Sequence, residues 1–137
     1  MARWLVDGMN VIGARPDGWW RDRDGAMRRL TADLDAFARA TGEPVAVVFD
    51  GRPRAIDAER VEVRFATRRG PNAADDDIAA LAAADGDAAT LTVVTSDAAL
   101  AGRARAAGAR VVGAGAFRRM LDDAAQEDGG GGRSSAG

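Results

Sequence analysis

The sequence predicts an α/β fold of three layers, in which helices cover both faces of a mostly parallel sheet. Short apolar runs at residues 4–6, 45–49 and 91–94 have the composition of strands that are buried on both faces. Segments with helical apolar spacing lie between these runs, and this alternation is typical of βα units in a parallel sheet. Acidic residues follow each run, which places them at one edge of that sheet.

The composition restricts the chemistry that the chain can perform. The 137 residues include no histidine, cysteine, lysine or tyrosine, so all 19 basic residues are arginine. This excludes histidine and thiolate machinery, the usual zinc sites, lysine-dependent P-loops and Schiff bases. The groups that titrate near neutral pH are carboxylates and the amino terminus. Catalysis here would therefore be carboxylate chemistry, for which a hard metal ion is the natural partner.

The length suits one domain, which we expect to comprise residues 1–127. A chain of about 150 residues buries roughly 68–70% of its unfolded surface, enough for a core without disulfides. Residues 128–137 are rich in glycine and serine and are expected to form a disordered tail. No apolar run approaches the roughly 20 residues that span a bilayer, and there is no signal-like N-terminus. We therefore expect a cytoplasmic protein without membrane contact.

Residues 4–13 begin the pattern that later segments repeat. The run at 4–6 ends on Asp7, although three residues alone do not separate strand from helix by periodicity. Gly8 allows a positive φ or a close backbone approach, and Asn10 offers donor and acceptor groups. Two interpretations stay open: Asp7 is aimed at a ligand site, or Asp7 and Gly8 form a turn that Asn10 follows as a cap.

The next elements follow from residue spacing. Residues 25–41 carry apolar side chains three and four positions apart, which predicts an amphipathic helix that Gly42 ends. The run at 45–49 predicts a buried strand that ends on Asp50. Strict alternation over residues 61–65 predicts a strand with one solvated face, near an edge of the sheet.

The second half of the chain continues the alternation of helices and strands. Asn72 is placed to cap a helix that begins near Ala73, with Asp75 in a capping-box-like position. The other expected elements are a strand at 91–94, a helix at 98–107, a short strand at 111–112 and a final helix around 117–121.

Acidic residues gather at the predicted strand ends and helix starts. Since the carboxyl ends of parallel strands meet at one edge, these carboxylates converge, and repulsion raises the pKa of at least one of them. A divalent cation offsets such repulsion; Mg²⁺ prefers oxygen ligands, and Mn²⁺ also fits. The set comprises Asp7, Asp50, Asp75, Asp76, Asp77 and Asp97.

Each acid also has an ordinary structural explanation. Asp97 can cap a helix, and Asp50 can be a turn residue before Gly51. The acids at 75–77 can favour the positive end of a helix, at about 0.3–1 kcal/mol each, and for Asp77 this is the preferred explanation. A wholly structural account requires four coincidences at the same edge, so a functional interpretation is preferred for the set.

Five blocks of the sequence occur in a fixed order: DGMNVIG at 7–13, VFDG at 48–51, VEVRF at 61–65, ADDDI at 74–78 and TSD at 95–97. Together they resemble the YacP-like branch of the NYN-domain proteins, within the PIN-like nuclease superfamily. The resemblance extends from about residue 4 to residue 121. It implies a Rossmann-like PIN/NYN domain and an endoribonuclease that uses Mg²⁺ or Mn²⁺ to hydrolyse RNA phosphodiester bonds.

The resemblance also implies roles for individual residues. A metal-activated water would attack the phosphodiester, and paired ions in such sites lie about 3.5–4 Å apart. By this resemblance the metal-binding acids are Asp7, Asp75 and Asp97, the additional catalytic acids are Asp50 and Asp76, and the polar supports are Asn10 and Thr95.

Three features depart from the family pattern. Met9 replaces the aromatic residue expected beside Asn10, and Ala79 stands where a further acid is common. The chain ends soon after its last helix, without the longer basic extension of some relatives. These departures concern the choice of substrate more than the binding of metal.

Arginine and tryptophan side chains near the predicted strand ends suit single-stranded RNA. Arginine forks match phosphate, and the adjacent tryptophans in the polar connection 15–25 can stack unpaired bases at about 1–3 kcal/mol per base. The opposing interpretation is a solvated Arg/Asp surface with tryptophan packed on the sheet, and the net charge of −2 is not that of a basic coat. The expected RNA-binding residues are Arg15, Trp19, Trp20, Arg52, Arg54, Arg68 and Arg69.

Two functions therefore compete. The preferred one is a metal-dependent endoribonuclease for single-stranded RNA, associated with the ribosome or RNA-processing machinery or with general RNA turnover. The alternative is a catalytically weak or inactive RNA-binding module of the same fold. A phosphotransfer domain is a weaker third interpretation, because receiver domains need a lysine and the related phosphatases need an acid at Met9. The oligomeric state stays open.

Overall fold

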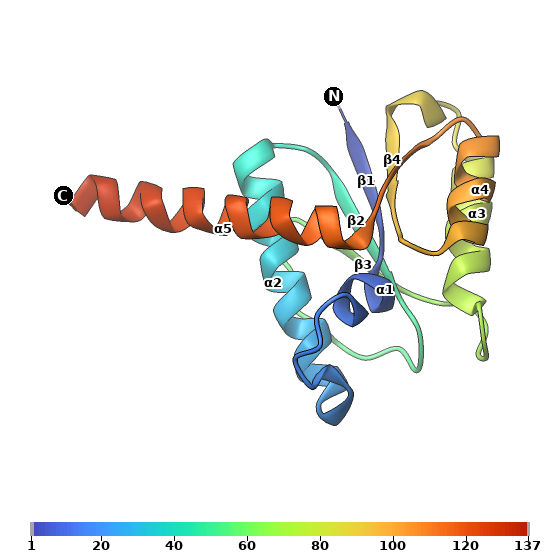
Figure 1. Ribbon diagram of the computed structural model, residues 1–137, viewed down its shortest axis with the longest axis horizontal. Coiled ribbons are helices and arrows are strands. Elements are labelled where there is room, and N and C mark those ends of the chain that lie inside the picture. The colour runs from blue at the N-terminus through green and yellow to red at the C-terminus, as the bar shows by residue number, and fades with distance from the viewer. Residues whose placement is uncertain (1, 137) are drawn as a thin grey trace.

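The computed structural model describes residues 2–136, and the side chains of residues 2–127 (Figure 1). The predicted disordered tail at 128–137 lies outside the residues that are described with side chains, so it stays a prediction. In chain order the elements are β1 (Arg3–Asp7), α1 (Gly8–Gly13), the 3-10 helix η1 (Trp19–Arg21), α2 (Arg23–Thr41), β2 (Val45–Phe49), β3 (Glu62–Phe65), α3 (Ala73–Ala84), the 3-10 helix η2 (Ala88–Thr90), β4 (Leu91–Val94), α4 (Ala98–Ala106), β5 (Arg110–Val112) and α5 (Ala114–Ala136).

The strands form one sheet in the order β3-β2-β1-β4-β5. Every strand pairing within residues 2–136 is parallel, which confirms the predicted parallel α/β architecture. β3 lies at one edge, as its alternating pattern predicts, and its side chains alternate between exposed and half-buried. β1 lies at the centre, between β2 and β4, so the chain order reverses beside it. In open α/β sheets this is the position where ligands bind.

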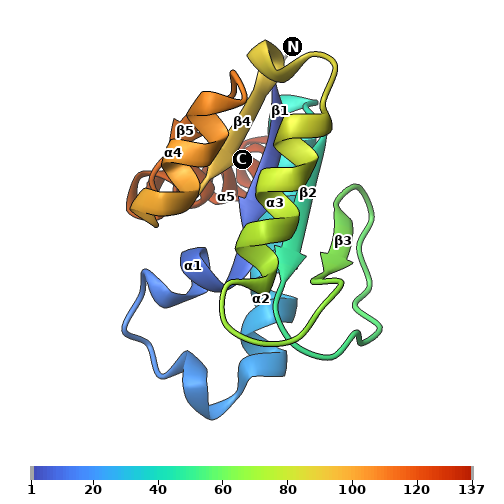
Figure 2. The same cartoon turned by 90° about the vertical axis from the view of Figure 1, so that its right-hand side faces the viewer.

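Helices cover both faces of the sheet, as predicted. α2 and α5 lie on one side and α3 and α4 on the other (Figure 1), and in the turned view α3 and α4 lie in front of the strands (Figure 2). Side chains of a strand alternate between its faces. In β1, Trp4 and Val6 therefore join the cluster that includes α2 and α5, while Leu5 joins the cluster of α3 and α4.

An aromatic cluster fixes α2 and α5 against the central strand. The Trp4 ring lies 5.2 Å from that of Phe37 on α2 and 5.6 Å from that of Phe117 on α5, measured between centroids. Phe37 and Phe117 meet edge to face at 5.3 Å. Such pairs contribute about 0.5–1.5 kcal/mol each beyond their area burial, so β1 is held firmly on this face.

Three local predictions need correction. The short helix α1 begins directly after β1, in a segment for which no helix was predicted. The helix predicted at 25–41 begins at Arg23, because Asp22 accepts a hydrogen bond from the backbone N–H of Gly25 and acts as its cap. The prediction that Asn72 caps α3 is wrong: the residue is left-handed, with φ of 64°, and its side chain makes no capping hydrogen bond.

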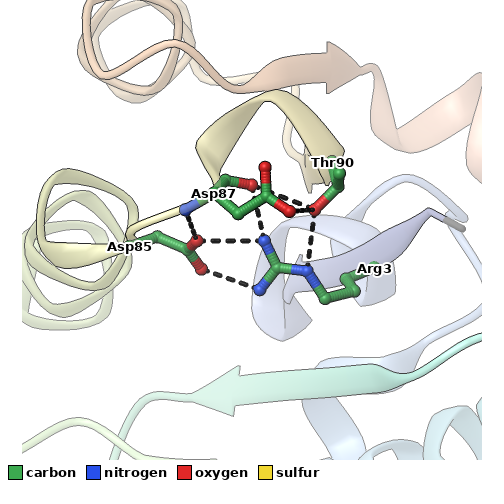
Figure 3. A network of polar contacts seen from close by, with 4 residues as sticks. All are labelled: Arg3, Asp85, Asp87 and Thr90. Carbon is green, nitrogen blue, oxygen red and sulfur yellow. Dashed lines mark hydrogen bonds and ion pairs between the residues drawn. The ribbon is translucent and has the colours of Figure 1, made fainter.

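The amino edge of the sheet is closed by a polar network (Figure 3). Arg3 donates two hydrogen bonds to the Asp85 carboxylate, at 2.8 and 2.9 Å. It also donates to Thr90 Oγ1 at 2.9 Å and to the carbonyl of Asp87 at 2.7 Å. The bond from Arg3 lowers the pKa of Asp85 to about 2. The network ties β1 to the connection between α3 and β4, at the end of the sheet opposite the acids described next.

Candidate functional site at the carboxyl edge of the sheet

The alternation of strand side chains places the predicted acids on one face. Leu5 faces α3 and α4, so Asp7, two residues on, faces the same way. Thr95 likewise shares the face of Val93. Asp50 follows β2 on the α3 side and accepts a hydrogen bond from the backbone N–H of Ala74 at 3.1 Å. The polar ends of β1, β2 and β4 thus meet below the first turns of α3 and α4.

Asp7 is the buried centre of this group, with 4% of its surface exposed. Its Oδ2 accepts a 3.0 Å hydrogen bond from the Thr95 hydroxyl, and its carboxylate also accepts the backbone N–H of Asn10. Burial raises the pKa of Asp7 to about 6, and the charges of Asp75 and Asp50 add to the rise, while the two hydrogen bonds oppose it. A carboxyl with this pKa is still mostly ionised at neutral pH, so the site buries a negative charge.

Polar side chains brace the segment that follows β4. Thr95 Oγ1 accepts the backbone N–H of Asp97 at 3.1 Å, and Asn10 Oδ1 accepts that of Ser96 at 2.8 Å. Ser96 Oγ in turn accepts the backbone N–H of Ala114 at 2.8 Å. Asn10, which was expected as a polar support, thus contacts the segment that carries Asp97. The role of Ser96 was missed, although its place between Thr95 and Asp97 is the signal that could have revealed it.

Asp97 serves α4 directly. Its Oδ1 accepts the backbone N–H of Leu100 at 2.8 Å, which confirms the alternative of an N-cap. Its charge still reaches Asp75, on the first turn of α3. Burial raises the pKa of Asp75, and the charges of Asp97, Asp50 and Asp76 raise it further. The two helices therefore present their N-terminal acids to one another.

Asp76 and Asp77 are engaged by neighbouring groups. Asp76 accepts hydrogen bonds from Arg68 at 3.0 Å and from Arg103 at 2.8 Å, and the bond from Arg103 is the main cause that lowers its pKa. Asp77 accepts two hydrogen bonds from Thr67, one from its backbone N–H at 2.6 Å and one from its hydroxyl at 2.9 Å. Arg103 was not anticipated, since nothing local in the sequence shows which face of α4 meets α3.

The donor set can be compared with what a divalent cation requires. The converging groups are carboxylate, hydroxyl and amide oxygens, and the mutual repulsion of the acids is what a hard cation would relieve. The oxygen ligands that these residues offer therefore suit Mg²⁺ or Mn²⁺. Among the described residues, however, no group of three acidic side chains is already arranged to hold a metal ion. Binding would therefore require the side chains to draw together.

The residues expected to bind RNA divide into paired and available groups. Arg15 is held by Asp122 at 2.6 and 2.7 Å, and Arg54 lies 3.5 Å from Asp24. Arg68 is held by Asp76, whereas Arg52 and Arg69 are exposed. Trp19 packs partly against the core, as the structural interpretation predicted, while Trp20 stays 55% exposed.

Among the described residues, none of the helices is long and apolar enough to cross a membrane.

Comparison with known proteins agrees with this fold. The chain matches the family described as YacP-like NYN domain over residues 4–130. It is similar to a crystal structure of Rae1 (YacP) from Bacillus subtilis, at 28% identity and a TM-score of 0.82, covering 98% of this chain and 81% of that one. A W164L mutant of the same protein matches at 30% identity and a TM-score of 0.78, over 93% of this chain and 79% of that one. No curated protein matches the chain.

Proposed function

Because the chain belongs to the YacP-like NYN domain family, which has a nuclease-type fold, we propose that it is a metal-dependent endoribonuclease that hydrolyses phosphodiester bonds of single-stranded RNA. The observation that carries the proposal is the convergence of acids from three strand ends and two helix starts, with a raised pKa at Asp7 and Asp75. Such repulsion contributes nothing to folding, and perturbed carboxylates of this kind gather at functional sites.

Three acids are assigned to the metal ion. Asp7, Asp75 and Asp97 would hold Mg²⁺ or Mn²⁺, and Asp50 would add negative charge beside them. When bound there, the ion would supply Lewis acidity to the phosphoryl oxygens and a lowered pKa for water. The proposal is supported by the oxygen-only donor set and by the negative charge that Asp7 buries at neutral pH, which a cation would compensate.

The other residues are assigned to orientation and to substrate contact. Thr95 and Asn10 fix the direction of the Asp7 carboxylate through their hydrogen bonds. Asp76 is a positioning residue, because Arg68 and Arg103 already occupy both of its oxygens. Exposed Arg52, Arg69 and Trp20 are the side chains assigned to RNA.

The test is cleavage of end-labelled, mixed-sequence single-stranded RNA in EDTA, Mg²⁺ and Mn²⁺. Asp97→Asn is a sharp variant because asparagine caps a helix about as well as aspartate, so the fold should persist. Asp7→Asn keeps an acceptor for Thr95, and Asp123→Asn removes an exposed acid of α5 as the matched control. We expect metal-dependent cleavage that Asp7→Asn and Asp97→Asn abolish and Asp123→Asn retains. Equal cleavage by all four proteins would overturn the proposal.

One observation favours a second candidate, an RNA-binding module that cuts poorly. Asp50 and Asp97 each use an oxygen to hold the N-terminus of a helix, which is a sufficient structural reason for both. Tight RNA binding in EDTA without cleavage in Mn²⁺ would identify this alternative. The cytoplasmic location and a setting at the ribosome or in RNA turnover stay predictions under either function.

A further inference from the structure

A second polar pocket lies between α1, α2 and α5, lined by residues separate from the acids. Its volume is about 120 Å³, well below the roughly 300–1,000 Å³ of sites that enclose whole small molecules. A pocket of this size lined by several guanidinium groups suits one tetrahedral anion. The lining residues that matter are Arg15, Arg29, Arg118, Asp17, Asp33 and Trp19.

Arg118 is incompletely compensated in this pocket. Its Nε is buried and has no hydrogen-bond partner among the described residues, and its Nη1 lies 3.4 Å from Asp33 Oδ2. Burial lowers the pKa of Arg118, and the charge of Arg15 lowers it further, while burial raises the pKa of Asp33. A well-formed ion pair would shift both pKa values in the opposite directions. No described acceptor therefore reaches the Nε of Arg118, although its Nη1 donates a long hydrogen bond to Asp33 in the same pocket.

The other two arginines differ in what holds them. Arg15 is fixed by Asp122 on α5, so it contributes a positioned positive charge. Arg29 is exposed and makes no ion pair with any described carboxylate, in contrast to Arg28 beside it, which bonds Asp24 at 2.7 Å. The guanidinium of Arg29 is thus the donor that an incoming anion can reach, and the half-buried Arg118 adds an incompletely compensated positive charge beside it.

The pocket continues into an exposed aromatic surface. Trp19 lines the pocket, and its ring meets that of Trp20 edge to face, 6.1 Å between centroids. Trp20 is the large apolar side chain most open to solvent in the described part of the chain, and Arg21 lies over its ring at 5.9 Å. The pocket and the exposed ring of Trp20 are therefore neighbours, joined through Trp19.

We infer that this pocket binds a backbone phosphate of the RNA while Trp20 stacks on an adjacent base. The inference rests on the proposed function, since RNA is its substrate class. It adds Arg29 and Arg118 as binding residues and places a contact to the strand apart from the acids. The phosphate accepts from Arg29 and compensates the charge of Arg118, and the base covers an exposed indole.

The test measures binding of a short fluorescein-labelled single-stranded RNA by anisotropy, in EDTA so that cleavage does not interfere. Arg29 is exposed, so the variant Arg29→Gln should fold normally. The control, Arg119→Gln, removes the same charge from an exposed position of α5, next to Arg118 in the sequence. We expect Arg29→Gln to weaken binding about tenfold, as for a lost hydrogen bond to a charged group. The negative slope of log K against log salt should become shallower by about 0.7, the value for one phosphate contact on a single strand. Arg119→Gln should change neither, and Trp20→Ala should weaken binding at an unchanged slope.

The outcomes separate this inference from the proposed function. If Arg29→Gln binds RNA like Arg119→Gln while the wild type cleaves RNA in Mn²⁺, the pocket assignment is wrong and the proposed function stands. If the wild type neither binds nor cleaves, both fail. Inorganic phosphate is the second probe. Suppose that phosphate raises the melting temperature of the wild type but not of Arg29→Gln, while both proteins bind RNA equally. The pocket then binds a free anion, and the RNA assignment is overturned.

Discussion

The Thr95 hydroxyl lies 3.0 Å from Oδ2 of Asp7 and joins the carboxyl ends of β1 and β4. Thr95 Oγ1 also accepts the backbone N–H of Asp97. The hydrogen bond that the Thr95 hydroxyl donates to Asp7 lowers the pKa of Asp7 against the effect of burial. One neutral side chain therefore supports the two acids on which the proposed chemistry depends.

Replacing Thr95 by valine should raise the pKa of Asp7 above about 6, because the shape is kept and the hydrogen bond to the charged form is lost. We expect the acidic limb of the cleavage profile to move to higher pH by on the order of one unit. The measurement is the pH dependence of kcat/KM, with Thr95→Ser as the control that keeps the hydroxyl. An unshifted profile for Thr95→Val would contradict the assigned role.

Asp7→Asn should stabilise the metal-free protein at neutral pH. The folded-state pKa of Asp7 is raised to about 6, so the folded state binds more protons than the unfolded state between about pH 4 and 6 and loses stability as pH rises through that window. The variant lacks this loss, and its free energy of unfolding at pH 7.5 should be higher by on the order of 1–3 kcal/mol. Urea unfolding in EDTA at pH 4 and 7.5 tests this; a variant that is less stable at pH 7.5 contradicts it.

Metal should stabilise the wild type much more than Asp7→Asn. Millimolar Mn²⁺ should raise the melting temperature of the wild type, because a ligand that binds only the folded state stabilises it by mass action. Asp7→Asn should show a much smaller rise, and Asp123→Asn should respond like the wild type. Equal shifts in all three proteins would place the metal elsewhere.

Asp76→Asn should reduce cleavage far less than Asp75→Asn. Asp76 is half-exposed and bound by Arg68 and Arg103, and exposed ion pairs contribute about 0–1 kcal/mol. Asp75 instead has a raised pKa and faces Asp97 and Asp50. We expect a loss of less than tenfold for Asp76→Asn and of at least a hundredfold for Asp75→Asn, measured as kcat/KM. Similar losses would restore Asp76 to the catalytic set.

Gly8→Ala should destabilise the protein, because a Cβ at this position would overlap the Phe49 ring and lie 3.0 Å from Val47. Overpacking of a buried site costs about 1–3 kcal/mol. Gly13→Ala lies in the same helix with open space around it, and should be neutral or stabilising by up to about 1 kcal/mol. Chemical denaturation of both variants provides the comparison, and equal effects would contradict the packing argument.

Asp85→Asn should lower stability at pH 7 without altering cleavage, because Asp85 lies at the amino edge of the sheet in the network of Arg3. The pKa of Asp85 is lowered to about 2, so its contribution is complete above the ordinary value near 4 and is lost as pH falls towards 2. The difference between wild type and variant should shrink over that window. Urea midpoints across pH 2–7 measure it, and a pH-independent difference would contradict the linkage.

Much of the fold could be predicted from the sequence because its signals are local. Apolar runs such as 45–49 and 91–94 form buried strands, and parallel pairing then brings Asp7, Asp50 and Asp97 to one edge. The alternation over 61–65 correctly indicated an edge strand. These inferences need only the chain order and one rule about parallel sheets.

The remaining features depend on which helix faces meet. No local pattern shows that Arg103 reaches Asp76, or that Arg118 is buried beside Asp33. For the same reason Arg15 and Arg68 were interpreted as free for RNA, although the packed helices supply each with a carboxylate. The left-handed Asn72 was missed because capping preference and tolerance of positive φ favour the same residue type.

The central place of β1 has a consequence for how the protein is made. β1 is synthesised first, yet Thr95, which contacts Asp7, follows 88 residues later. Contacts of such long range form late in folding, because the loop between them must close first. A nascent chain that ends before β4 carries Asp7 without Thr95 or Asp97. The acidic centre is therefore absent from the growing polypeptide and is assembled only when nearly the whole domain has emerged and folded.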